Sequence, residues 1–235
     1  MNLKDKVKVM VLGYKATEQS YLKYLRKKGI RVGKGVRIFR PFNTNIDIQN
    51  PNLLVIGDYV QMTGPVTILT HDYSWSVLKR KYGYIYGNQQ LTSIGNNVFI
   101  GWGATILGGS QIGNNVIIGA NSVVTGRIES NSVYAGNPAR KIMTLEQFRN
   151  KREKKQLSEA KQFVLTYKKS FGSFPPLSEM DEYFFLFHVN KLDENFERQL
   201  HLMGNYKFSD SILKDISPKF KSYQDFLKYC VKEEK

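Results

Sequence analysis

A six-residue repeat in the middle of the chain limits its fold more than any other feature. Aliphatic residues followed by glycine recur six positions apart, at Ile94 and Ile100 and again at Ile112 and Ile118. The pentapeptide that begins at Ile94 returns unchanged at Ile112. A period of six fits neither an amphipathic helix nor one simple strand. It fits a short strand plus a turn, with three such units closing one coil of a triangular solenoid around an aliphatic ladder.

The same phase extends upstream and then breaks. Further aliphatic members are Val32, Ile38, Ile56, Met62 and Ile68, whereas Thr44 and Asn50 are weak members, so we expect an irregularity near 44–52. The interval from Ile68 to Ile94 is not a multiple of six, which predicts a loop, 72–93, that leaves the coil. Long loops that project from a rigid scaffold commonly carry function.

The segments outside the repeats predict a cap and a helical extension. We expect an N-terminal basic helical cap over 1–31, in which Thr17 caps a helix that runs through Lys28 and ends at Gly29. The solenoid would occupy 32–143 and an α-helical extension 144–235. The helices expected in the extension cover 144–169, 178–190, 192–203, 208–215 and 222–232, and Pro175-Pro176 ends the first of them.

Charge and cysteine content narrow the class of protein. The net charge is +15, and residues 1–40 contribute +10 of it. This charge is equally consistent with a plain solvated face and with an anionic partner, such as nucleic acid, an anionic membrane or a phosphate-bearing small molecule. Cys230 is the one cysteine, so an internal disulfide framework and a cysteine zinc cluster are excluded. Without a signal-peptide pattern or a long apolar run, we expect a cytoplasmic protein.

The repeats resemble those of the left-handed β-helix, hexapeptide-repeat acyltransferases. The most specific stretch is 94–142, which closes with Ser132-Val133-Tyr134-Ala135-Gly136-Asn137-Pro138-Ala139-Arg140. Among these enzymes the sequence is most similar to the galactoside/maltose, xenobiotic and polysaccharide O-acetyltransferases, over about 17–143. The resemblance implies a mainly β fold, a left-handed parallel β-helix, and a homotrimer that binds acetyl-CoA between neighbouring subunits and requires no metal.

The resemblance also implies roles for particular residues. His71, at the start of the projecting loop, would be the general base that deprotonates the acceptor, and an imidazole suits that task because it titrates near neutrality. The residues that match coenzyme-binding positions are Gly101, Trp102, Gly119, Ala120, Thr125, Arg140 and Lys141. The candidate acceptor-binding residues are Asn43, Asp72, Tyr73 and Trp75. Trp102 departs from a family position that is usually small or polar, and Gly126 and Met143 stand where the family often has basic residues.

Several functions fit these residues. The first is acetyl-CoA-dependent O-acetylation of a sugar, in a cell-surface polysaccharide or its nucleotide- or lipid-linked precursor, with peripheral association with a membrane face. The alternatives are an aminosugar N-acetyltransferase, a xenobiotic acetyltransferase and a non-catalytic solenoid scaffold. A zinc-dependent carbonic anhydrase of this fold is excluded because only one histidine lies in the solenoid. Nucleic-acid binding lacks a recognised module.

Overall fold

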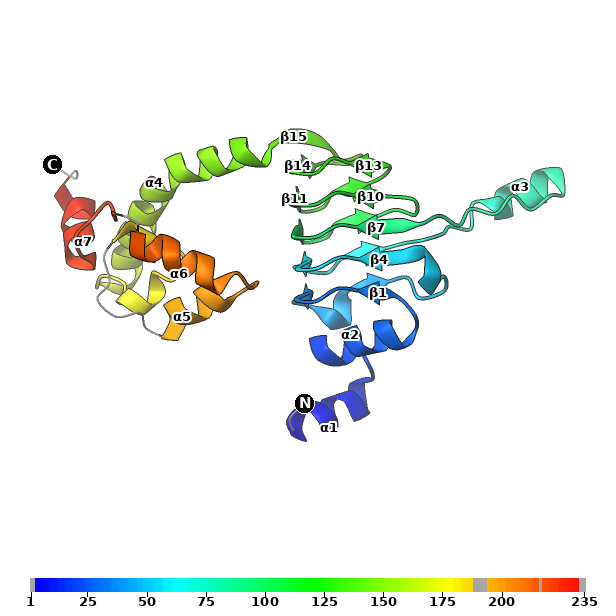
Figure 1. Cartoon of the computed structure of the whole chain (residues 1–235), viewed down its shortest axis with the longest axis horizontal. Helices are drawn as coiled ribbons and strands as arrows, with labels where there is room; N and C mark the ends of the chain where they lie inside the picture. The colour runs from blue at the N-terminus through cyan, green and yellow to red at the C-terminus, as the bar shows by residue number, and fades with distance from the viewer. Residues whose placement is uncertain (1–2, 188–193, 216, 233–235) are drawn as a thin grey trace. The chain divides into compact units, whose positions relative to one another are not determined.

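The computed structural model describes residues 3–187, 194–215 and 217–232, and these residues form two compact units. The first unit covers Met1–Phe148 and the second Arg149–Lys235, with the boundary inside one long helix (Figure 1). In the described part of the chain, no helix is long and apolar enough to cross a membrane.

The first unit is a parallel β-helix with three sheets (Figure 1). Sheet A contains β1 (Arg31–Val32), β4 (Leu54–Ile56), β7 (Thr92–Ile94), β10 (Gln111–Ile112) and β13 (Arg127–Ile128). Sheet B contains β2 (Arg37–Ile38), β5 (Gln61–Met62), β8 (Val98–Ile100), β11 (Val116–Ile118), β14 (Ser132–Ala135) and β15 (Arg140–Thr144). Sheet C contains β3 (Asn45–Ile46), β6 (Thr67–Ile68), β9 (Thr105–Ile106) and β12 (Val123–Val124).

Aliphatic ladders fill the inside of this prism. Each ladder stacks the in-phase residue of one coil on that of the next, as in the register Ile56–Ile94–Ile112–Ile128 of sheet A. In sheet B the register is Ile38–Met62–Ile100–Ile118–Tyr134, and in sheet C it is Ile46–Ile68–Ile106–Val124. These side chains are all buried, so the repeat encodes the core directly.

The first coil corrects the predicted phase. Ile46, and not Thr44 or Asn50, is the member of the buried aliphatic ladder, because Ile46 pairs with Ile68 across sheet C. Short 3₁₀ turns, η1 (Pro41–Asn43) and η2 (Pro51–Leu53), lengthen the steps on either side of Ile46. The residues added to these two steps together make one six-residue unit, so the six-residue phase resumes at Ile56. The irregularity expected near 44–52 is thus confirmed in position.

The glycines and asparagines of the repeat have different tasks. Left-handed φ values occur at Asn97, Asn115 and Asn131, near 55°, and not at the glycine of each Ile-Gly pair. Gly95 is needed for another reason, because a Cβ there would lie 2.6 Å from the carbonyl oxygen of Gly113 in the next coil. Thus the glycines allow close stacking and the asparagines make the turn.

Two helices precede the solenoid, and the second of them covers its N-terminal end. The helix predicted from Thr17 is α2 (Glu18–Lys27), with a capping box between Thr17 and Ser20, and its buried face packs on the first coil. Before it lies α1 (Leu3–Leu12), which the sequence reading did not predict. The predicted projecting loop contains α3 (Trp75–Tyr82), which extends away from the sheets (Figure 1).

The second unit is helical and has its own core. The helix α4 (Leu145–Phe171) begins at the Thr144 cap, and α5 (Glu194–His201), α6 (Tyr206–Asp215) and α7 (Tyr223–Lys232) follow. The helix predicted over 178–190 is replaced within the described residues by 3₁₀ turns, η3 (Leu177–Glu179) and η4 (Phe184–Leu186), after which Phe187 is extended and bridges Phe220. Residues 188–190 and 192–193 of the predicted helices, and His188, lie outside the described residues.

Candidate active site

His71 lies three residues beyond Ile68 of β6 and contacts a carboxylate from the coil before it. Its Nδ1 is 2.6 Å from Oδ2 of Asp47, which follows β3. Both side chains are largely covered, with 13% of His71 and 5% of Asp47 exposed. An ionised carboxylate can only accept a hydrogen bond. Nδ1 is therefore the nitrogen that donates to Asp47, and Nε2 is the nitrogen that can accept a proton from another molecule.

Hydrogen bonds fix Asp47 in its charged form. Oδ2 accepts from the backbone N–H of Thr70 at 3.1 Å and from the Thr70 hydroxyl, and Oδ1 accepts from the N–H of Gln49 at 2.9 Å. Burial by itself raises the pKa of Asp47, but the hydrogen bonds from Thr70, Gln49 and His71 together outweigh burial and hold the pKa below its usual range. Asp47 is thus a charged acceptor that orients His71.

Sequence reasoning missed Asp47 because it used the wrong phase for the first coil. With Thr44 and Asn50 as the in-phase positions, Asp47 falls in the middle of a repeat. With Ile46 in phase, Asp47 follows a sheet C strand directly, at the corner where Thr70 and His71 follow β6. The Ile46-Asp47 pair was the available signal.

Asp72 and the first aromatic residues of the loop lie beside His71. Asp72 is exposed and accepts hydrogen bonds from the N–H of Ser74 at 2.9 Å and from the Asn88 side chain, which joins the two arms of the loop. The Ser74 hydrogen bonds lower the pKa of Asp72. The Tyr73 ring meets His71 edge-on, 5.4 Å between centroids, and Trp75 follows at 5.6 Å from Tyr73.

A second group of predicted residues lies at another corner of the prism. We call the turns that follow sheet C the C–A corner, which contains His71, and the turns that follow sheet B the B–C corner. The predicted residues at the B–C corner are Asn43, Gly101, Trp102, Gly119 and Ala120. The strands of sheet C separate the two corners, so one chain does not bring these two groups together.

The small residues at the B–C corner are required by stacking. A Cβ on Gly101 would lie 2.6 Å from the Ala120 nitrogen, and one on Gly119 would lie 2.8 Å from the Ala135 Cβ. Trp102 is 46% exposed, and the Arg40 guanidinium lies 5.0 Å from the centroid of its ring. The indole therefore stands on the surface, with a cation on one face.

The last predicted residues lie near the C-terminal end of the solenoid. Thr125 is exposed at the C–A corner, and Arg140 is exposed at the start of β15. The Lys141 ammonium lies 2.6 Å from Oε2 of Glu129, and this ion pair raises the pKa of Lys141 and lowers that of Glu129. Lys141 would have to break its ion pair with Glu129 in order to bind a phosphate.

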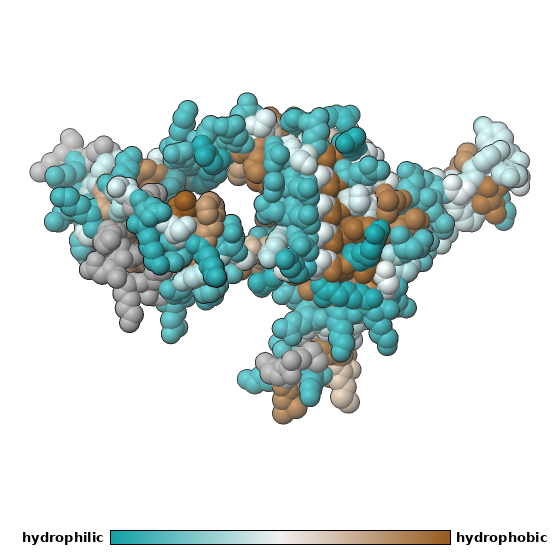
Figure 2. Space-filling view, in the orientation of Figure 1, coloured by the Kyte–Doolittle hydropathy of each residue, from teal (hydrophilic) through white to brown (hydrophobic). Residues whose placement is uncertain are grey.

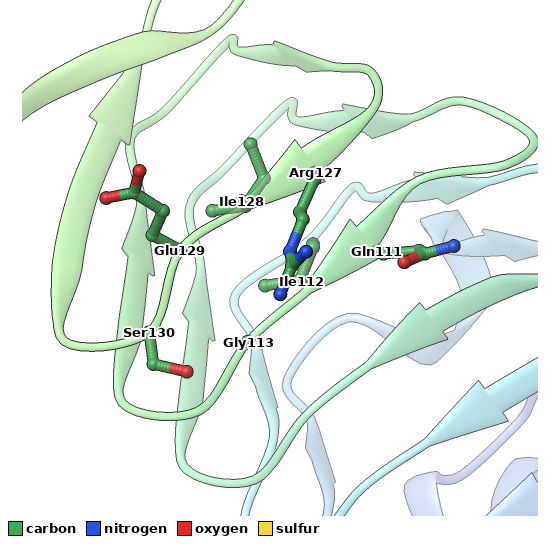
Figure 3. A pocket seen from close by; sticks show the side chains of 7 residues that line it. All are labelled: Gln111, Ile112, Gly113, Arg127, Ile128, Glu129 and Ser130. Carbon is green, nitrogen blue, oxygen red and sulfur yellow. The ribbon is translucent and has the colours of Figure 1, made fainter.

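An open hollow of about 730 Å³ was not foreseen in the sequence. Figure 3 shows the residues that line it, beside the last strands of sheet A, with the Arg127 side chain near Ile112. Its lining residues are Gln111, Ile112, Gly113, Arg127, Ile128, Glu129 and Ser130. None of the predicted site residues is among them.

Comparison with known proteins agrees with the six-residue repeat. Residues 91–126 match the model of the bacterial transferase hexapeptide family (six repeats). The chain is 41% identical over 127 residues to protein CapG of Staphylococcus aureus, which covers 54% of this chain and 73% of CapG.

The chain is also similar to two solved structures. A maltose O-acetyltransferase from Clostridium difficile 630 is 30% identical, with a TM-score of 0.37, over 54% of this chain and 75% of that one. A galactoside acetyltransferase in complex with coenzyme A is 26% identical, with a TM-score of 0.39, over 54% and 70%. From the repeat match and the extent of its identity to CapG, the chain belongs to the hexapeptide-repeat acyltransferase family, whose fold is the left-handed β-helix.

Proposed function

We propose that this protein is an acetyl-CoA-dependent O-acetyltransferase that acetylates a sugar hydroxyl, in a cell-surface polysaccharide or its nucleotide- or lipid-linked precursor. The single observation that carries the proposal is the His71–Asp47 pair, 2.6 Å between Nδ1 and Oδ2. A sugar hydroxyl is a weak nucleophile and needs a base in the transition state. An amine can arrive partly deprotonated, so the oriented base favours an alcohol acceptor over an amine.

In the proposed mechanism His71 acts twice. Its Nε2 accepts the proton of the acceptor hydroxyl while that oxygen attacks the thioester carbonyl. The charged ring, stabilised by Asp47, then returns the proton to the sulfur of coenzyme A as the carbon–sulfur bond breaks. No cysteine is available for an acyl-enzyme, because Cys230 is buried in the second unit and burial raises the pKa of its thiol to about 11.

The coenzyme would be held by the turns of the B–C corner and by Arg140 at the start of β15. The exposed turn at Ala120 and Trp102 offers backbone groups for the pantetheine arm, and the Arg140 guanidinium suits a phosphate. Because His71 and this turn lie at different corners of one chain, we place the complete site between neighbouring subunits of a homotrimer. Asn43, Asp72, Tyr73 and Trp75 would then face the acceptor.

The test is coenzyme A release from acetyl-CoA with matched alcohol and amine sugars, for the wild type and His71→Ala. We expect transfer to the alcohol that falls by about 10²–10⁴-fold in His71→Ala. Preferential transfer to the amine, with little loss in His71→Ala, would favour the N-acetyltransferase. A protein whose Tm does not rise with coenzyme A would be a scaffold instead.

A further inference from the structure

The helix α1 has an apolar stripe that the rest of its unit does not cover. Leu3, Val7, Met10 and Val11 recur at the spacing of one helix face. Their exposed fractions are 77%, 55%, 89% and 74%. No residue of α1 is buried, and Figure 2 shows hydrophobic side chains on the surface of this helix. The stripe therefore does not serve the core of this chain.

The other side of α1 faces the cap of the solenoid. Val9 lines an open groove with Tyr14 and Tyr24, whose rings are stacked 3.7 Å apart. Val9 lies nearly on the opposite side of the helix axis from the stripe. The helix is thus attached by one side and presents its stripe on the side directed away from the groove.

Lysines surround this exposed stripe. Lys4, Lys6 and Lys8 are exposed on α1. A second copy of the helix seated on the stripe would bring six α1 ammonium groups together, and like charges repel. A negatively charged surface would neutralise them instead. Ten residues of helix span about 15 Å, which is half of a bilayer core, so α1 can lie on a membrane but not cross it.

We propose that α1 is a docking surface for an anionic lipid bilayer, in which the apolar stripe and Lys4, Lys6 and Lys8 make the contact. The apolar stripe enters the boundary between headgroups and acyl chains, and the lysines, whose stems follow the apolar side chains, meet lipid phosphates. This inference is drawn only from the surface of the N-terminal helices, so it does not depend on the proposed acetyl transfer.

The test is co-sedimentation of the full chain with vesicles of phosphatidylglycerol and phosphatidylcholine, and with vesicles of phosphatidylcholine only. We expect binding to the anionic vesicles that weakens at high salt. Replacing Lys4, Lys6 and Lys8 by Gln should weaken it about a hundredfold, since each lysine near such a surface contributes about fivefold. Met10→Gln should weaken it about tenfold.

Leu12→Gln is the matched control, because Leu12 lies on α1 but outside the stripe. It should change binding less than about twofold. Equal binding to both kinds of vesicle, or equal losses in Met10→Gln and Leu12→Gln, would overturn the proposal. If the wild type ignores vesicles and Met10→Gln alters the oligomeric state in light scattering, a second copy occupies the stripe. The rise of Tm with coenzyme A is measured separately and reports binding of the coenzyme. A failure of vesicle binding is therefore distinguished from a failure of the acetyltransferase proposal.

Discussion

Oδ2 of Asp47 lies 2.6 Å from Nδ1 of His71, although the first coil supplies one residue and the second coil the other. The stacking of Ile46 on Ile68 sets their height along the solenoid. The added length before η2 lets the chain turn so that Oδ1 of Asp47 also binds Gln49. The pair is thus a product of the irregular part of the repeat.

Replacing Asp47 by Asn tests whether this carboxylate orients the base. The amide keeps the shape but can donate to Nδ1, which would leave the proton on Nε2, the atom that must accept one. We expect kcat to fall by about 10²–10⁴-fold. The KM for acetyl-CoA should change little, because Asp47 lies at the C–A corner. Steady-state kinetics will show the difference between the two constants.

Asp58→Asn provides a control for that variant. Asp58 accepts a hydrogen bond from the N–H of Lys34 at 2.9 Å, in a turn that follows sheet A. The same chemical change there should leave kcat within about twofold, as expected for a surface substitution away from special contacts. If Asp47→Asn has a kcat as high as Asp58→Asn, Asp47 does not orient the base.

Acid should weaken the contribution of Asp47 to stability. Its pKa is lower in the folded chain than in the unfolded one, so the unfolded state binds its proton first as the pH falls. The stabilisation is complete above the ordinary aspartate pKa of about 3.9 and is lost as the pH falls through the folded value. Urea unfolding of the wild type and Asp47→Asn should give a difference in free energy that shrinks below about pH 4. A constant difference would refute the linkage.

Two buried threonines should respond oppositely to the same substitution. The Thr44 hydroxyl has no hydrogen-bond partner among the described residues, whereas the Thr70 hydroxyl donates to Asp47. Thr44→Val removes an unsatisfied polar atom and should stabilise the protein by about 1 kcal/mol. Thr70→Val removes a donor from a buried carboxylate and should cost about 1–3 kcal/mol. Chemical denaturation measures both, and a loss of stability in Thr44→Val would mean that its hydroxyl is satisfied.

The regular part of the solenoid could be predicted because one periodicity sets both its strands and its core. The in-phase residues from Ile56 to Val124 are the buried ladder, apart from the projecting loop. The third strand of the first coil could not be placed from the sequence. The residues added to the two steps around Ile46 sum to one six-residue unit, so the phase after this coil is the same as in a regular repeat. The helix α1 was missed because alternating lysines over 4–8 obscure its helical spacing, which only the whole stretch to Val11 reveals.

The candidate site was only partly predictable, for a related reason. His71 follows a regular strand and could be placed, but its partner Asp47 depends on the register of the irregular coil. The residues of the B–C corner were predicted as coenzyme contacts, whereas close stacking alone requires Gly101 and Gly119. A single sequence does not separate a glycine kept for stacking from one kept for a ligand, because both leave the same residue at the same position.

Mixing two inactive variants will test whether the site lies between subunits. His71→Ala removes the base at the C–A corner, and Ala120→Trp places a large side chain in the exposed turn of the B–C corner, where it should block the coenzyme. If neighbouring chains of a trimer supply the two corners, a refolded equal mixture has both corners intact at about a quarter of its interfaces, and about a quarter of wild-type activity should return. Each variant refolded alone should stay inactive. If the mixture is no more active than the two separate variants, both corners of a working site belong to one chain.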